Sequence, residues 1–268
     1  MPDVLTTAEG VRFLRSPDAH FSDLPGYAFS PNYLEFEGLR LHYIDEGPRD
    51  GPVALLMHGM PTWSFLNRKI IAKLVEAGYR CIAADHIGFG RSDKVIEDDW
   101  YSIARHIAAH ELLIDTLDLR GITLFCQDWG GPISLAQVAQ MPERFAHLVI
   151  MNTWLHHEAV RRAYDAPFVG LGYEGHAGPR RFPLSLPFDN PLGGNADGQA
   201  KDFEALLGWQ KPIHFIWGGA DDVFTEAWGR QWASHYPQAR FDLLPEAGHF
   251  LQETHGEEIA ELLLSHAR

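Results

Sequence analysis

The chain has 268 residues, and its 36 Asp and Glu residues outnumber its 22 Lys and Arg residues, which gives a net charge of −14. This acidic balance argues against nucleic acid and anionic membranes as partners. The composition is ordinary for a globular protein, and the length fits one α/β domain with a small insertion.

Cysteine content and the N-terminal sequence bear on the cellular compartment. Cys81 and Cys126 are the two cysteines, and each lies in a segment that reads as a buried strand, so we expect no disulfide and a reducing compartment. The N-terminus lacks a basic segment followed by an apolar run, and no stretch reaches membrane-spanning length. We therefore expect a cytoplasmic protein.

The predicted elements begin with an antiparallel hairpin after a turn-rich segment, residues 1–30. Apolar and polar residues alternate over 33–36 and 39–44, as in strands at a sheet edge. Strands are then expected at 53–57, 80–84, from 122, 148–151, 213–217 and 241–244, and helices at about 63–77, 101–117, up to 140, 226–236 and 257–267. This alternation predicts an α/β fold with a mostly parallel, doubly wound sheet.

Residues 152–212 interrupt the alternation. They contain eight glycines and six prolines and show little periodicity. Because insertions over the carboxyl ends of the strands usually shape a substrate pocket, we interpret this segment as a reduced cap or lid. The core then comprises residues 1–151 and 213–268.

The strongest candidate residue lies in a turn between a buried strand and a helix. Residues 122–126 are apolar or β-branched, the segment after the turn has a helical pattern, and Asp128 lies between them. Small residues at Cys126, Gly130 and Gly131 permit the sharp turn of a nucleophile elbow. An ionised carboxylate needs no base, so Asp128 could attack an electrophilic carbon directly. The alternative is that Asp128 only caps the helix.

Hydrolysis of the resulting ester requires a base, and His249 is the candidate. It follows the last predicted strand in a glycine-hinged loop, and an imidazole can take a proton from water at neutral pH. For the acid that orients the ring we favour Asp221 over Asp222. The usual rival position, after the strand ending at Met151, holds Asn152 and Thr153 and so offers no carboxylate. The order Asp128, Asp221, His249 is the order of nucleophile, acid and histidine in α/β hydrolases.

Two further residues could stabilise negative charge. The backbone N–H of Met60, in a tight turn after the strand at 53–57, could join the backbone N–H of Trp129 in an oxyanion hole. The indole N–H of Trp129 is a donor without an acceptor, which suits a weakly hydrated anion, although a buried Trp is more often part of the core.

Two other patterns receive a structural interpretation. His106 and His110 lie four residues apart on an expected helix and could share a metal, but without the glutamate of the zinc protease motif we interpret them as a polar helix face. Gly88 and Gly90 lack the third glycine of a dinucleotide fingerprint, which indicates a structural turn.

Six short runs resemble the haloalkane dehalogenase family of the α/β-hydrolase fold. They are residues 58–64 (HGMPTWS), 88–94 (GFGRSDK), 126–131 (CQDWGG), 163–168 (AYDAPF), 181–183 (RFP) and 247–253 (AGHFLQE). The resemblance implies hydrolytic dehalogenation without a metal or cofactor: Asp128 displaces halide from a small apolar haloalkane, and His249, oriented by Asp221, activates water to release an alcohol. It also implies that Trp129 donates a hydrogen bond to the halide ion.

The chain departs from the family pattern in two places. Family members use a second halide donor, either an Asn after the His-Gly pair or a Trp from the lid, and Met60 occupies the first position here. Trp154 or Trp63 could substitute. Eight residues separate 152–154 from 163–168, which resemble the start and the later part of a lid, so the lid is abbreviated.

Two alternatives remain open. The first is an epoxide hydrolase, or another hydrolase with the same triad, for which Tyr164 and Tyr173 could supply lid hydroxyl groups. The second is a ligand-binding or regulatory protein on a hydrolase scaffold. The particular substrate and the oligomeric state do not follow from the sequence.

Overall fold

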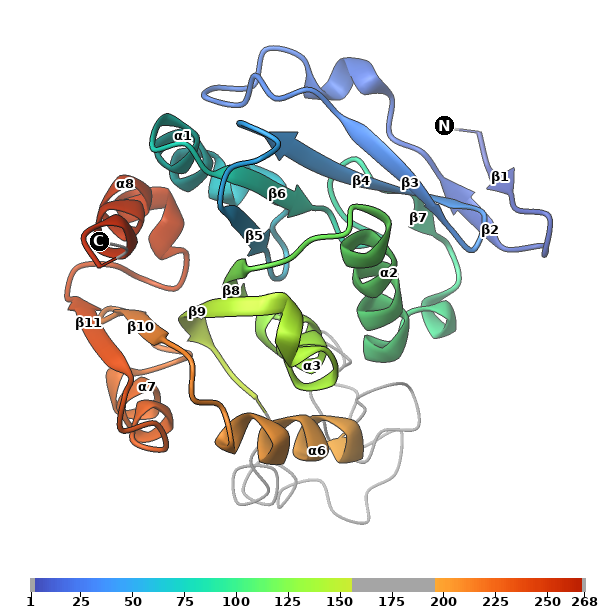
Figure 1. Ribbon diagram of the computed structural model, residues 1–268. Helices are drawn as coiled ribbons and strands as arrows, with labels where there is room; N and C mark the ends of the chain where they lie inside the picture. The colour runs from blue at the N-terminus through green and yellow to red at the C-terminus, as the bar shows by residue number, and fades with distance from the viewer. Residues whose placement is uncertain (1–2, 156–195, 267–268) are drawn as a thin grey trace.

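An eight-stranded sheet organises the fold (Figure 1). The computed structural model describes residues 3–155 and 196–266. Across the sheet the strand order is β11-β10-β9-β8-β5-β6-β4-β3. The strands are β3 (Asn32–Phe36), β4 (Leu39–Glu46), β5 (Val53–Met57), β6 (Arg80–Ala84), β8 (Ile122–Asp128), β9 (Phe145–Thr153), β10 (Ile213–Gly218) and β11 (Arg240–Leu244).

The sheet is mostly parallel, as predicted. Neighbouring strands from β11 to β6 pair in parallel, whereas β4 pairs antiparallel with both β6 and β3. Every residue of β5 and β8 is buried, which is typical of central strands covered on both faces. The predicted edge hairpin is confirmed by the pairing of β3 with β4.

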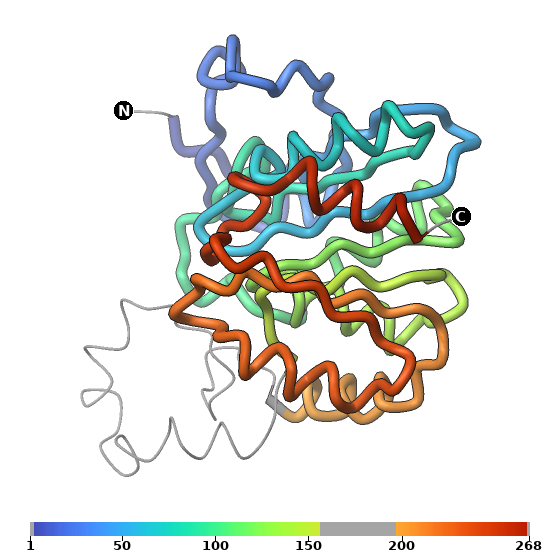
Figure 2. The backbone as a smooth tube through the Cα atoms, turned by 90° about the vertical axis from the view of Figure 1, so that its left-hand side faces the viewer, coloured from blue at the N-terminus to red at the C-terminus, as the bar shows by residue number. Residues whose placement is uncertain are grey.

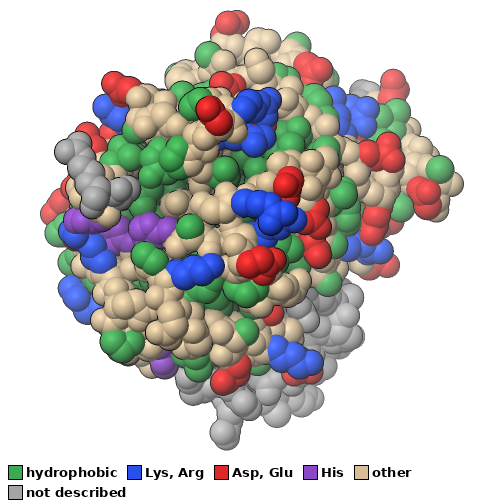
Figure 3. Space-filling view, in the orientation of Figure 1, with side chains coloured by type: hydrophobic (Ala, Val, Ile, Leu, Met, Phe, Trp, Pro, Cys, Tyr) green, Lys and Arg blue, Asp and Glu red, His purple; other side chains and the backbone are tan. Residues whose placement is uncertain are grey.

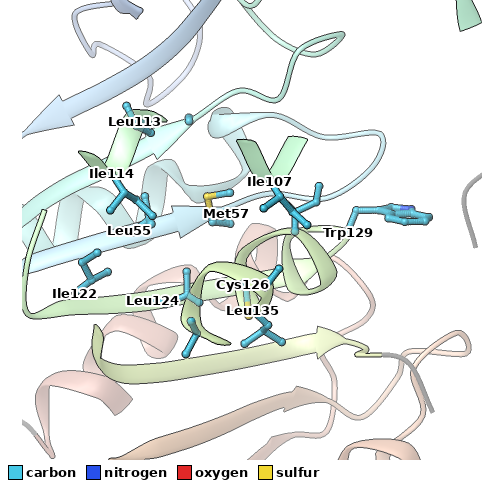
Figure 4. Close-up of a cluster of buried hydrophobic side chains, with 14 of the residues drawn as sticks. Leu55, Met57, Ile107, Leu113, Ile114, Ile122, Leu124, Cys126, Trp129 and Leu135 are labelled. Carbon is cyan, nitrogen blue, oxygen red and sulfur yellow. The ribbon is translucent and has the colours of Figure 1, made fainter. Parts of the chain in front are cut away.

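Helices cover both faces and create two cores. Helices α1 (Arg68–Glu76) and α8 (Leu251–Leu264) lie side by side on one face (Figures 1 and 2). Helices α2 (Ile103–Thr116), α3 (Gly130–Gln140) and α7 (Glu226–Ala233) cover the other face. Figure 4 shows part of the second core, with Trp129 at its edge and the indole extending beyond the strand end.

Several short elements escaped prediction. A three-stranded sheet joins β1 (Leu5–Thr6), β2 (Arg12–Leu14) and β7 (Lys94–Val95), and strands of two or three residues show no readable alternation. The 3₁₀ helices are η1 (Asp18–Phe21), η2 (Ser64–Asn67), η3 (Asp98–Trp100) and η4 (Pro142–Arg144). η2 replaces the first turn of the helix expected from residue 63.

Two helical segments were not expected. Helix α8 begins at Leu251, directly after the loop that carries His249, and it is kinked at the non-helical residue His255, so the helix predicted from about residue 257 corresponds to the part after the kink. In the segment expected to be irregular, helix α6 (Ala196–Leu207) packs against α3, and Leu206 and Trp209 are buried in the core. Most of the predicted lid, residues 156–195, lies outside the described residues and includes Tyr164 and Tyr173.

Surface charge and helix length bear on the partners of the protein. On the face shown in Figure 3, acidic and basic side chains are interspersed, so no single sign of charge dominates it. Within residues 3–155 and 196–266, no helix has both the length and the apolar character needed to cross a membrane.

Candidate active site

The strand–turn–helix around Asp128 is tightly closed. Asp128 ends β8 with a φ of 51°, a left-handed conformation that is strained for a residue other than glycine. A Cβ on Gly130 would collide with the carbonyl of Met57, and one on Gly131 would collide with the hydroxyl of Thr153. The small residues therefore permit the elbow for the steric reason that the sequence indicated.

Hydrogen bonds fix the orientation of the Asp128 carboxylate. The backbone N–H of Met60 donates to Oδ1 at 2.7 Å, and the Thr153 hydroxyl donates to the backbone carbonyl of Asp128. A Cβ on Gly59 would overlap the carboxylate, so the loop after β5 approaches it as closely as a glycine allows. Of the two expected backbone donors, Met60 reaches the carboxylate, whereas the Trp129 backbone N–H makes no hydrogen bond to it within the described part of the chain.

His249 connects Asp128 to Asp221. Its Nε2 lies 3.4 Å from Oδ2 of Asp128, and its Nδ1 lies 2.9 Å from Oδ2 of Asp221. Asp221 is buried, whereas its neighbour Asp222 is exposed, which agrees with the choice between them. The structure thus brings together three side chains that are separated by up to 121 positions in the sequence.

Asp221 is held ionised by several donors. Burial opposes its charge, but the hydrogen bond with His249, the backbone N–H of Val223 and the side-chain amide of Asn152 outweigh burial and lower its pKa. Asn152 donates to Oδ2 at 2.7 Å and also accepts from the backbone N–H of Gly218 at 2.6 Å. Asn152, at the position that the sequence analysis excluded for lack of a carboxylate, therefore holds Asp221 in place.

The two carboxylates also control the charge of His249. Burial lowers its pKa, but the hydrogen-bonding and coulombic effects of Asp128 and Asp221 outweigh burial and raise the pKa to about 9. The imidazole is therefore protonated at neutral pH in this state of the protein, and it can accept a proton only after one of the carboxylates loses its charge.

Trp129 lines a cavity of about 250 Å³ beside the elbow, together with Met60, Phe89, Tyr101 and His106. Its ring meets the ring of Trp154 edge-on at 4.7 Å between centroids. Trp63, the other candidate for a second donor, instead packs among the rings of the N-terminal segment and η2. Trp154 is therefore the candidate in contact with Trp129, and its buried indole N–H has no hydrogen-bond partner among residues 3–155 and 196–266.

The interpretation of His106 and His110 as a polar helix face was wrong. His110 is fully buried, and its Nε2 lies 2.6 Å from Nδ1 of His86. Burial lowers the pKa of His106 to about 4 and of His110 to about 3, so both rings are neutral. His86 in turn contacts the carbonyl of His58, which supports the turn that presents Met60.

A carboxylate at the elbow of such a sheet, with a histidine and a second carboxylate beside it, defines an α/β hydrolase with an aspartate in the nucleophile position. A family model described as the alpha/beta hydrolase fold matches residues 52–175.

Known proteins give a narrower assignment. The haloalkane dehalogenase of Psychrobacter cryohalolentis is 38% identical over 301 aligned positions, which cover 95% of this chain and 97% of that protein. The haloalkane dehalogenase of Mycolicibacterium paratuberculosis is 36% identical and covers 94% and 97%. The tetrameric structure of haloalkane dehalogenase DpaA from Paraglaciecola agarilytica has a TM-score of 0.80 and 34% identity, covering 96% of this chain and 99% of that one. The chain belongs to the haloalkane dehalogenase family.

The alignment with the Psychrobacter protein is longer than this chain. Because its 301 aligned positions exceed the 268 residues of this chain, that relative contains segments that this chain lacks.

Proposed function

We propose that the protein hydrolyses haloalkanes to an alcohol and a halide ion through a covalent ester on Asp128. The proposal rests on the different surroundings of the two carboxylate oxygens of Asp128. Oδ1 accepts a hydrogen bond from the Met60 backbone N–H, whereas Oδ2 faces His249. One oxygen is thereby anchored and the other is available for attack. The family membership supplies the substrate class.

In the first step, Oδ2 of Asp128 attacks the carbon that bears the halogen. The carbon–halogen bond breaks, and its electron pair leaves with the halide ion. The indole N–H of Trp129, in the cavity wall beside the elbow, donates to the departing halide. Trp154, which contacts Trp129 and whose N–H has no partner in the described part of the chain, is the candidate for a second donor.

In the second step, water attacks the ester carbonyl carbon of Asp128 while Nε2 of His249 takes its proton. Negative charge develops on Oδ1, where the Met60 N–H already donates. The tetrahedral intermediate collapses and the alkoxide leaves with the proton from His249. The carboxylic acid left on Asp128 then gives its remaining proton to His249, which regenerates the carboxylate and the protonated resting ring. Asp221 keeps the ring in the tautomer that presents Nε2.

The order of the steps follows from the charge of His249. The pKa of about 9 in the resting protein depends in part on the negative charge of Asp128. Esterification removes that charge, so the pKa of His249 falls and the ring becomes a base when the ester exists. His249 therefore becomes able to accept a proton from water only after the substrate has reacted with Asp128.

Domain organisation and location follow as further proposals. We retain a reduced cap within residues 152–212 over a core of 1–151 and 213–268; β9 runs on to Thr153, and α6 lies against α3, so core packing extends into both ends of that segment. Free, buried thiols at Cys81 and Cys126 support a reducing, cytoplasmic location.

The test compares the wild type with His249→Phe on a panel of bromo- and iodoalkanes, and it measures halide release together with the mass of the protein. We expect catalytic halide release by the wild type. We expect the variant to release at most one halide per protein and to retain an alkyl adduct on Asp128. Absence of both release and adduct across the panel would refute the proposal and direct attention to epoxides and to non-catalytic binding.

A further inference from the structure

Gln127, the residue before the elbow aspartate, contacts the candidate base in two places. Its side chain is completely buried in β8. The amide nitrogen lies 3.1 Å from the backbone carbonyl of His249 and 3.2 Å from Nε2 of the same residue. One amide therefore holds the loop that carries His249 and lies beside the atom that would take a proton from water.

The surroundings determine which way round the amide lies. The carbonyl of His249 can only accept a hydrogen bond, so the amide nitrogen must face it. The opposite orientation would bring two carbonyl oxygens together and repel. In the observed orientation Oε1 of Gln127 is buried without a partner among the described residues, a cost that the hydrogen bond to the His249 carbonyl must offset.

This orientation discriminates between the two charge states of His249. Asp221 accepts from Nδ1, so the neutral ring has its lone pair on Nε2 and can accept from the amide of Gln127. The protonated ring would direct an N–H at the amide nitrogen of Gln127, which has only donors to offer. The charged groups that face the ring are Asp128 at Nε2 and Asp221 at Nδ1, and both favour protonation. Phe224 and Phe250 contact the ring without charge.

We propose that Gln127 is a positioning residue that favours the neutral form of His249, so that the ring becomes an effective base once Asp128 is esterified. The role of His249 as a base rests on the proposed function. The contacts of Gln127 and their effect on the protonation of the ring are independent of the proposed function.

The test uses Gln127→Met, which keeps the length and volume of the side chain and removes its donors. Gln137→Met is the matched control. Gln137 is also completely buried, donates to a backbone carbonyl (Ile107, 3.1 Å) and has an Oε1 without a partner in the part of the chain that the structure describes. The first measurement is the titration of the His249 ring by nitrogen NMR in the substrate-free protein. We expect its pKa to rise by about 0.5 to 1 pH unit in Gln127→Met and to stay unchanged in Gln137→Met.

The second measurement separates the two chemical steps in single-turnover experiments. In Gln127→Met we expect ester formation within about twofold of the wild type, whereas ester hydrolysis should be several-fold slower at pH 7 and should recover at higher pH. Should Gln127→Met fail to fold, Gln127→Leu provides the same two readouts.

An unchanged or lowered His249 pKa, or a loss of hydrolysis that is equal at every pH, would overturn the inference and leave Gln127 with a packing role. Because the titration needs no substrate, a protein that released no halide would refute the proposed function and still allow this inference to be judged.

Discussion

Nε2 of His249 lies 3.4 Å from Oδ2 of Asp128, close enough for strong attraction between their charges and longer than a good hydrogen bond. On the other side of the ring, Nδ1 lies 2.9 Å from Asp221. The looser contact is the one that the proposed reaction would break, and the tighter contact is the one that it would keep.

Replacing the nucleophile should change the base. In Asp128→Asn the charge next to Nε2 is lost, as it would be in the ester, so we expect the His249 pKa to fall from about 9 by about 1 unit or more. NMR titration of the ring measures this. Asp222→Asn removes an exposed carboxylate next to Asp221 and should leave the titration unchanged. Equal pKa values in wild type and Asp128→Asn would show that the two side chains are not coupled.

The same coupling makes stability depend on pH. The pKa of His249 is raised in the folded protein above its ordinary value of 6.5, so the folded state binds the proton more tightly than the unfolded state does. This contribution is fully present below about pH 6.5 and is lost as the pH rises through about 9. Urea unfolding should therefore show His249-dependent stability declining over that window. The decline should be smaller in Asp128→Asn, and an equally steep decline in both proteins would contradict the assignment.

Gly59 should tolerate no side chain. Gly59→Ala would force a methyl group onto the Asp128 carboxylate and displace the turn that presents Met60. We expect a stability loss of about 1–3 kcal/mol and at least a tenfold loss of halide release. Gly208→Ala is the control, since its methyl group would meet only the carbonyl of Ala205, at an ordinary 3.5 Å. Denaturation and activity assays on both variants check the prediction, and full activity in Gly59→Ala would argue against the carboxylate position described here.

Much of the fold could be predicted because its strands are continuous apolar runs. The bounds of β5 and β6 agree with the predicted ranges, and the elbow at Asp128 was recognisable from its small neighbours. The approach of Asp221 and His249 to Asp128 was expected from their positions at the carboxyl ends of parallel strands.

The features that were missed depend on contacts between distant segments. A buried Asn or Gln has no sequence pattern, so the support that Asn152 gives to Asp221 and the contact of Gln127 with His249 required the structure. Helix α6 was not predicted because Gly198 lies near its start and its apolar residues are only weakly periodic. Packing on α3 stabilises this helix. The four-residue spacing of His106 and His110 on α2 did not show that His110 would be buried against His86.

Asn152 can be tested as the support of the acid. Asn152→Ala removes the donor to Asp221 and leaves the Gly218 N–H buried without its acceptor, so we expect a stability loss of about 1–3 kcal/mol. With Asp221 less well held, ester hydrolysis should slow by about tenfold. Asn67→Ala removes a similarly buried amide whose nitrogen has no partner among the described residues, and it should leave the hydrolysis rate unchanged. Equal effects of the two variants on hydrolysis would reduce Asn152 to a packing role.

The role of Trp129 makes the last prediction. In Trp129→Phe the ring loses the N–H that would meet the halide ion, and that N–H forms no hydrogen bond in the described part of the protein. Stability should therefore fall by about 1 kcal/mol, for lost volume alone, while the rate of halide release at saturating substrate falls by about 10- to 100-fold.

Trp232→Phe provides the control for that substitution. Trp232 is also buried, but it lies on α7 in the core and is not among the residues that line the cavity. Its replacement should cost similar stability and leave the rate of halide release unchanged. Inhibition by added bromide separates binding from chemistry, because Trp129→Phe should also weaken bromide binding by about tenfold. If bromide inhibits both variants as strongly as the wild type, the halide must bind elsewhere, and Trp154 would be the next residue to replace.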